Sequence, residues 1–308
     1  MAANPQTTTG TGPVATPISK SPSAFKRWFR LLLKSKTGTV GLIIVLTVIL
    51  ISIFAKQLAP HDPNQINPAM MLKPPVWMDG GSADYILGTD NLGRDILSRI
   101  IFGSQISLAV GISAVVLAGV IGVFVGLVAG YYGGIIDNIL MRLVDSFLAI
   151  PTILFALVIL SIFGPSVPTL IVVLGITNWV QYARLVRGEV LSIKEREFVK
   201  AAKSIGVRDN QIILRHLLPN VISPFIVIST LSVATTIILE ASLSFLGLGI
   251  QPPTISWGGI LSDGRDYIAT SWWLATFPGL AITITVLGII FLGDWLRDVL
   301  DPRANNGR

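Results

Sequence analysis

Apolar and polar positions fall into long blocks along this chain. Six mainly apolar runs are each close to the roughly 20 residues that a helix needs to cross a bilayer. Pro151 interrupts the third run and Pro224 lies near the start of the fifth. The blocks predict an all-α polytopic membrane protein with six transmembrane helices, at residues 38–57, 105–130, 139–163, 166–184, 221–247 and 277–297.

The segments around these runs differ in character. Residues 1–22 are rich in Thr, Pro, Gly and Ser without apolar periodicity, which predicts a disordered cytoplasmic tail. Residues 23–37 mix basic and bulky apolar side chains, which favours an amphipathic helix on the membrane surface. A signal-peptide n-region is the alternative, but no small-residue cleavage site follows and the next run is long enough to span. We expect an outer loop at 58–104, a membrane core at 105–303 and a short tail at 304–308.

Composition and charge support this picture. The 308 residues are 52% hydrophobic and 13% charged, whereas soluble proteins carry about 25% charged residues. Lysine and arginine concentrate before the first run, between the fourth and fifth, and after the sixth. The positive-inside rule then makes both termini and the 185–220 loop cytoplasmic, and turns 58–104 and 248–276 outward. Because the net charge of +6 follows topology, we expect membrane lipid as a partner and no nucleic acid.

A polar, basic stretch at 197–219 stands out between two apolar runs. Helical spacing puts four apolar residues on one face, away from Glu197 and Lys200. We expect Gly206 to end this helix in a left-handed cap, Asp209 to cap a second short helix, and Pro219 to end that one. A short exposed helix with small side chains suits a groove on another protein. The four apolar residues are Phe198, Ala201, Ala202 and Ile205.

A second helix is predicted in the outer loop, after Leu87-Gly-Thr-Asp-Asn-Leu-Gly-Arg-Asp. Thr89 or Asp90 can cap it. An apolar side starting at Leu92 and a polar side with Arg94 and Asp95 predict an interfacial helix feeding the second span.

Small residues recur every four positions in the second span, which gives a smooth face for close helix packing. The partner helix could belong to this chain or to another. The residues are Ala114, Ala118, Gly122, Gly126 and Gly130.

Motifs for chemistry are absent from the sequence. There is no cysteine, which excludes disulfides and thiolate chemistry, and there is no phosphate-binding loop or zinc-protease motif. His61 and His216 are predicted on opposite sides of the membrane, so we expect no metal site, no cofactor and no catalytic residues in this chain.

Three polar residues lie inside the predicted spans, where polar side chains are costly and need a partner or a function. Glu240, near the outer end of the fifth span, could fix helix packing through a hydrogen bond or ion pair, or could line a substrate path. Asn178 and Gln181 could line a pore or could bond a neighbouring helix.

Residues 200–219 resemble the coupling motif of binding-protein-dependent ABC importer permeases: Glu-Ala-Ala, three residues, Gly, nine residues, Ile-x-Leu-Pro. Lys200 stands in place of the Glu and His216 in place of the Ile. The outer segment is similar to the signature of the second, C-type permease subunit of dipeptide and oligopeptide importers. Its matching residues are Gly88, Thr89, Asp90, Gly93, Arg94 and Asp95.

The resemblance implies a type I ABC importer permease fold in a bacterial cytoplasmic membrane. It implies a second homologous permease subunit, two ATPase subunits that hold ATP and Mg, and an extracytoplasmic binding protein that delivers di- or oligopeptides. Nickel chelates, glutathione or small sugar conjugates are alternative cargoes. A stand-alone secondary transporter or channel, or a membrane scaffold, are alternatives of other classes. The coupling helices would lie in 194–219, with ATPase contacts from Glu197, Phe198, Lys200, Ala201, Ala202, Ile205, Gly206 and Pro219.

Overall fold

The computed structural model describes residues 31–33 and 35–300. The predicted tails at 1–22 and 304–308, and most of the amphipathic helix predicted over 23–37, lie outside the described residues. Within the described part the chain is helical and forms no strand; a single isolated bridge pairs Thr89 with Asp95.

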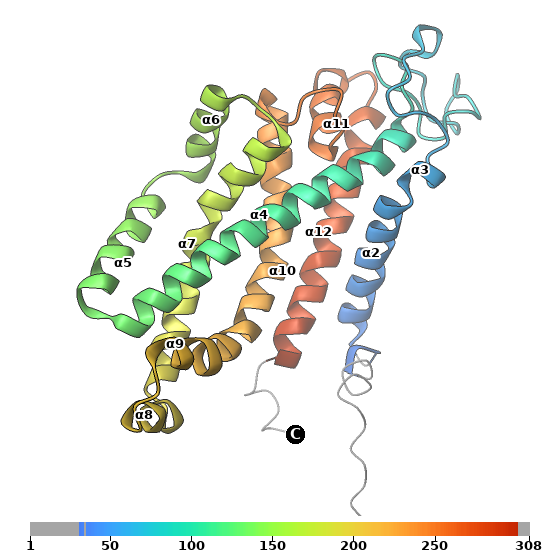
Figure 1. Cartoon of the computed structure of the whole chain (residues 1–308). Coiled ribbons are helices and arrows are strands. Elements are labelled where there is room, and N and C mark those ends of the chain that lie inside the picture. The colour runs from blue at the N-terminus through green and yellow to red at the C-terminus, as the bar shows by residue number, and fades with distance from the viewer. Residues whose placement is uncertain (1–30, 34, 301–308) are drawn as a thin grey trace, which may run out of the picture.

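Long helices run roughly side by side through the molecule (Figure 1). Short helices join them: α3 (Ala55–Leu58), α8 (Glu197–Ser204), α9 (Asp209–Ile212), α11 (Trp257–Gly264) and single turns at Pro68–Met70 and Arg265–Tyr267. The longer helices are α2 (Lys36–Ile53), α4 (Ile96–Tyr132), α5 (Gly134–Leu148), α6 (Thr152–Phe163), α7 (Val167–Lys194), α10 (Leu218–Leu243) and α12 (Trp273–Leu300).

The predicted spans correspond to five continuous helical segments and one broken pair. α2, α4, α7, the run from Asp209 to Leu248 and α12 are long and apolar enough to cross a membrane. α5 and α6 meet at 84° and make the sixth span only when taken together. The break falls at Pro151, because proline lacks an N–H and restricts the residue before it.

Three predicted boundaries were wrong. α4 begins at Ile96, so the second span and the expected interfacial helix are one 37-residue helix. α7 continues ten residues past the predicted end of the fourth span, to Lys194. Pro219 does not end a helix: α9 passes through a π-helical turn, Ile213–Leu217, directly into α10, with Pro219 near its start. Proline is tolerated there because the N–H groups of the first helical turn need no partner within the helix.

The small-residue stripe of α4 packs within this chain. A Cβ added at Gly126 would lie 2.7 Å from the carbonyl oxygen of Ala183 and from Val186 on α7. Lys194 Nζ, at the end of α7, donates to the Gly130 carbonyl at 2.9 Å. Side chains larger than hydrogen would force these two helices apart, so the small residues allow α4 and α7 to pack closely.

The two ends of the bundle carry different segments. α8, α9, the start of α2 and the end of α12 lie at one end, and the 59–95 segment and α11 lie at the other (Figure 1). This arrangement agrees with the predicted sidedness of the loops, while the orientation of the termini across the membrane stays a prediction.

Candidate functional site

α8 is a short helix held firmly against the bundle by one of its faces. Val199 and Ala202 are buried, and Val199 packs in a cluster with Ile193, Ile212 and Leu217. These partners belong to α7, α9 and the π turn, so α8 is fixed to the lower ends of two spanning segments.

The predicted apolar face of α8 is divided. Only Ala202 faces inward, whereas Ala201 is exposed, Phe198 is 43% exposed and Ile205 is 81% exposed. The inward direction is set by Val199 and Ala202, three positions apart, which turns the other apolar side chains toward solvent. The result is a small outward apolar surface, largely exposed to solvent, which we call the α8 outer face (Phe198, Ala201, Ile205).

The glycine stop after α8 is confirmed. Gly206 has φ +79, a conformation that other residues rarely adopt. Its N–H donates to Lys203 O, and the Val207 N–H donates to Ala202 O, both at 3.1 Å, which closes the helix.

The predicted cap on α9 was wrong. Asp209 is the first residue of α9, and no side chain caps this helix. Its carboxylate instead accepts a hydrogen bond from Tyr131 Oη at 2.5 Å. This bond ties α9 to the end of α4, a partner 78 positions away that local pattern could not indicate.

The two departures from the coupling motif both have intrachain contacts. Lys200 Nζ lies 2.9 Å from Glu195 Oε2, with both side chains exposed, and the hydrogen bond from Lys200 lowers the pKa of the Glu195 carboxyl. The His216 ring centroid is 6.1 Å from that of Phe198. Glu197 is the exposed first residue of α8, and Pro219 lies at the start of α10.

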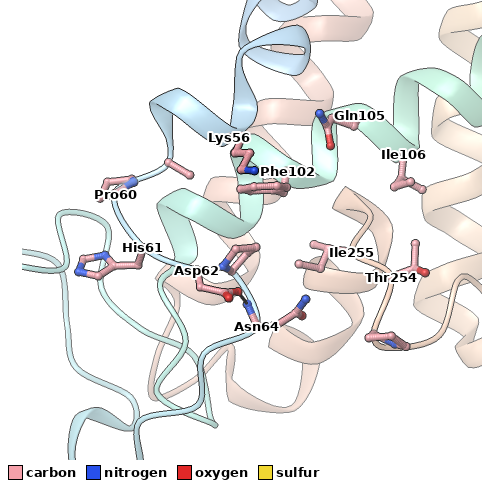
Figure 2. Close-up of a pocket in the computed structure, with 13 residues that line it drawn as sticks. Lys56, Pro60, His61, Asp62, Asn64, Phe102, Gln105, Ile106, Thr254 and Ile255 are labelled. Carbon is pink, nitrogen blue, oxygen red and sulfur yellow. Dashed lines mark hydrogen bonds between the residues drawn. The ribbon is translucent and has the colours of Figure 1, made fainter.

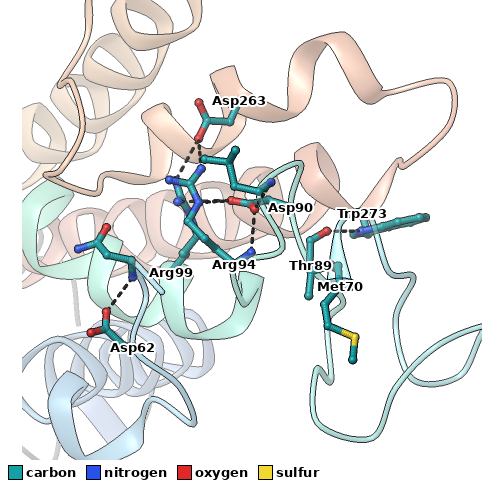
Figure 3. A network of polar contacts seen from close by, with 10 residues as sticks. Asp62, Met70, Thr89, Asp90, Arg94, Arg99, Asp263 and Trp273 are labelled. Atoms are coloured by element: carbon teal, nitrogen blue, oxygen red, sulfur yellow. Dashed lines mark hydrogen bonds and ion pairs between the residues drawn. The ribbon is translucent and has the colours of Figure 1, made fainter. Parts of the chain in front are cut away.

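The outer signature builds a buried network of charges (Figure 3). Asp90 Oδ2 accepts from Arg94 Nε at 2.6 Å and lies 3.4 Å from Arg99 Nη1. Asp263 Oδ2, on α11, lies 3.3 Å from Arg94 Nη2 and 3.0 Å from Arg99 Nη2. Burial raises the pKa of the Asp263 carboxyl, against the effect of the two arginines. Two carboxylates therefore compensate two guanidinium groups and fasten α11 to the start of α4.

Asp95, not Thr89 or Asp90, caps α4. Its Oδ2 accepts from the Ser98 N–H at 2.9 Å and from Ser98 Oγ at 2.6 Å. Arg94 and Asp95 are buried, so the expected polar side of an interfacial helix is wrong. Arg94 has Asp90 and Asp263 as partners and Asp95 Oδ2 has Ser98, as buried polar groups require, while Asp95 Oδ1 has no hydrogen-bond partner within the described residues.

Thr89 and two glycines complete the fold of this segment. Thr89 Oγ1 donates to the Met70 carbonyl, and the Thr89 carbonyl accepts from Trp273 Nε1 at 3.2 Å. Gly88 and Gly93 have φ +81 and +73, and a Cβ at Gly93 would overlap the Asn67 carbonyl oxygen. The signature residues are thus brought together in a packed, hydrogen-bonded segment and not around an open site.

Glu240 is fully buried between α4, α10 and α11. Ser244 Oγ and Ser256 Oγ donate to its Oε1 at 2.8 and 2.9 Å. Ser107 Oγ lies 3.5 Å from Oε2 and accepts from the Trp257 N–H at 3.1 Å. These contacts favour the packing interpretation of this residue over the substrate path.

Asn178 and Gln181 do not join Glu240. Asn178 Nδ2 donates to the Leu174 carbonyl of its own helix at 2.9 Å, and Gln181 is exposed. The structure therefore does not bring the three predicted path residues together.

Two clefts with some charged residues in their walls lie at opposite ends of the bundle. One of about 650 Å³ lies between the 56–64 segment, α4 and 253–255, with Lys56, Asp62 and Gln105 in its wall (Figure 2). The other, of about 630 Å³, lies between α7, α10 and α12, with Glu189 and Arg297 in its wall. Asn178, Gln181 and Glu240 line neither cleft.

Sequence reasoning missed several long-range partners. Asp145 pairs with Arg184 on α7 at 2.9 Å, and Asp137 pairs with Arg187 at 2.6 Å. Asp263 also went unnoticed. Acidic residues in apolar surroundings were the available signal, but their partners are 39 to 169 positions away.

Two family models match this chain. Residues 23–75 match the N-terminal TM domain of oligopeptide transport permease C, and residues 122–306 match the binding-protein-dependent transport system inner membrane component. The second match covers more than half of the chain.

Curated relatives align over nearly the full length. The chain is 43% identical to the dipeptide transport system permease protein DppC of Alkalihalophilus pseudofirmus, over 96% of this chain and 98% of the relative. It is 42% identical to the protein of the same name from Escherichia coli, over 94% and 96%. It is 39% identical to the di/tripeptide transport system permease protein DppC of Pseudomonas aeruginosa, over 96% and 97%.

The fold of this chain is similar to that of chains in solved transporter structures. An inward-facing structure of the MetNI methionine ABC transporter has a TM-score of 0.55 at 23% identity, covering 67% of this chain and 98% of that chain. A second crystal form has a TM-score of 0.51 at 21% identity, covering 66% and 96%. At these identities the likeness concerns the fold alone.

Proposed function

This chain belongs to the family of binding-protein-dependent transport system inner membrane components, multi-pass permease proteins of the bacterial inner membrane, and from that premise we propose that it moves di- and oligopeptides inward, driven by ATP hydrolysis on partner subunits. It is a transport component rather than an enzyme. The peptide cargo is suggested by the names of the relatives, which align over more than nine-tenths of their length.

The observation that carries the proposal is the construction of α8. One face is buried against the ends of α7 and the Asp209–Leu243 segment, and the α8 outer face is open. The sequence has no phosphate loop of its own. An exposed apolar helix face suits a groove on a partner, and an ATPase subunit is the partner that the family requires.

In this mechanism α8 acts as a lever. Closure of two ATPase subunits on ATP and Mg shifts α8, and the buried contacts of Val199 and Ala202 pass the shift to α7 and α10. The spans then rock against those of a second homologous permease subunit, and access alternates between the two sides. An extracytoplasmic binding protein delivers the peptide to the end of the bundle that carries 59–95.

A stand-alone carrier is the competing function. It would move its substrate without ATP and would need a concentrated polar site within the spans. The separation of Asn178, Gln181 and Glu240 argues against such a site in this chain.

Peptide uptake by the reconstituted complex tests the proposal. This chain is co-expressed with a homologous permease subunit and the ATPase subunits, purified, and placed in vesicles with the binding protein outside and ATP inside. We expect labelled di- and tripeptides to accumulate only with ATP and binding protein. Uptake by this chain alone, or uptake of a nickel chelate or glutathione in place of peptide, would overturn the function or its cargo respectively.

A further inference from the structure

An apolar β-turn projects from the 59–95 segment. The Met78 N–H donates to the Pro75 carbonyl at 2.9 Å, so Val76 and Trp77 occupy the two central positions of the turn. Both are exposed, Trp77 to 59%. Such positions are normally occupied by Gly, Asn, Asp, Ser or Pro, and a large aromatic side chain left in water forfeits the free energy of burying its apolar surface.

The turn is held in place from behind. The Val76 N–H donates to the Ile86 carbonyl at 3.2 Å, and Pro75 is buried. Met78 packs on a cluster that contains Ile96 and Trp273. The position of Trp77 is therefore fixed relative to the first turns of α4 and α12.

α12 gives the depth of this position in the membrane. Its run from Trp273 to Gly293 contains no charged residue and is ~31 Å long at 1.5 Å per residue, close to the ~30 Å of a hydrocarbon core. Phe277 lies one turn inside that run. The Trp77 ring packs edge-on against the Phe277 ring at 6.0 Å, and Trp272 lies 5.7 Å from the same ring. Trp77 is thus level with the membrane interface, where tryptophan is enriched.

The surface below Trp77 is also apolar and exposed. Leu280, Ile284 and Leu287 follow Phe277 along α12 at helical spacing and are each 43–49% exposed. This stripe is the continuation of the Trp77–Phe277 contact toward the middle of the bilayer. The two neighbouring charges, Lys73 and Asp79, flank the turn and are suited to the headgroup layer.

We propose that the Pro75–Met78 turn is an interfacial anchor, with Trp77 seated at the boundary between headgroups and acyl chains in the leaflet next to the 59–95 segment. The anchor fastens this segment, and with it the Asp90 network, to the lipid surface. It depends on the membrane-spanning fold and not on the transported cargo.

Spin labels can locate the turn directly, because the natural chain has no cysteine. Trp77→Cys is labelled with a nitroxide in the assembled transporter, in vesicles of phosphatidylethanolamine and phosphatidylglycerol. Asp84→Cys, exposed elsewhere in the same segment, is the water control, and Ile284→Cys on α12 is the acyl-chain control. Collisions with oxygen report lipid, and collisions with a water-soluble nickel chelate report water.

We expect a depth value for position 77 between those of the two controls, with oxygen access well above that at position 84. A value equal to that of position 84 would overturn the anchor. Exclusion of both reagents would also overturn it, because a protein partner would then cover the turn.

A second measurement avoids the label. Lipids brominated near the headgroup should quench the fluorescence of the wild-type complex more than that of Trp77→Phe, and lipids brominated at the chain ends should quench both equally. If the lipid brominated near the headgroup quenches the wild-type and Trp77→Phe complexes equally, the proposal is contradicted.

Discussion

Buried charges near the outer surface show how single residues shape this protein. Asp90 is surrounded by its own partners: two backbone N–H groups, at Leu92 and Arg94, and two arginine side chains. A buried carboxylate is tolerated only with such compensation. We therefore expect substitutions within this network to change the stability of the protein rather than its transport.

Asp90→Asn removes the charge that Arg94 and Arg99 share. Breaking a buried ion pair by removing one partner costs about 3–5 kcal/mol, so we expect a clear drop in the thermal midpoint of the purified complex. Asp266→Asn is the control, because Asp266 and its partner Arg265 are exposed and such pairs contribute at most about 1 kcal/mol. Equal shifts for the two variants would contradict the network's structural role.

Gly126→Leu tests the contact between α4 and α7. The added atoms would meet the Ala183 carbonyl and Val186 at 2.7 Å, and overpacking of this kind typically costs about 1–3 kcal/mol. Val120→Leu enlarges the same helix where it is 66% exposed and should leave the thermal midpoint unchanged. If Gly126→Leu is as stable as Val120→Leu, the close packing is wrong.

Glu240 separates a packing role from a transport role. Glu240→Gln keeps the one oxygen that accepts from both Ser244 and Ser256 and should preserve both the thermal midpoint and uptake. Glu240→Leu leaves these buried hydroxyls without an acceptor, at about 1–3 kcal/mol each, and should lower the thermal midpoint. Normal stability with impaired uptake in Glu240→Gln would restore the substrate-path interpretation.

At the scale of elements, the features that the sequence predicts depend on nearby residues, and the features that it does not predict depend on contacts between distant residues. Apolar run length located the spanning helices, and Gly206 located the end of α8, because both signals are local. The partners of Asp263, 164 and 169 positions away, depend on contacts that the local pattern does not encode. The buried side of α8 also depends on tertiary contacts. Val199 and Phe198 are adjacent apolar residues, yet Val199 is buried and Phe198 is exposed.

Ile205→Glu tests α8 as a docking element. Ile205 is 81% exposed, so the substitution should not unfold the chain, but docking would bury an unpaired charge. We expect the ATPase subunits to be lost during purification and ATP-driven uptake to fall with them. Lys203→Ala is the matched control on the same helix, because its side chain is exposed and lies outside the α8 outer face. Retention of the ATPases by Ile205→Glu would exclude α8 as the contact.

At the scale of the whole molecule, two ends with different properties are joined by rigid helices. One end presents the α8 outer face, and the other presents α11 and the 59–95 segment fastened by Asp90, Arg94, Arg99 and Asp263. α7 and α10 connect with α8 at one end, and Glu240 connects α10 with α4 and α11 near the other. Motion at α8 therefore has a continuous packed route through the bundle.

Site-directed cross-linking tests the central claim, that α8 is where an ATPase engages this chain. A single cysteine at Ile205, in a chain that has none, is compared with one at Asp84 at the other end of the bundle. Each variant is treated with a short bifunctional reagent in the assembled transporter, whose ATPases carry a single cysteine scanned around their docking groove. We predict a product between this chain and the ATPase from position 205, sensitive to ATP, and none from position 84. No product from position 205 with any groove cysteine, in a complex that still hydrolyses ATP and takes up peptide, would contradict the account.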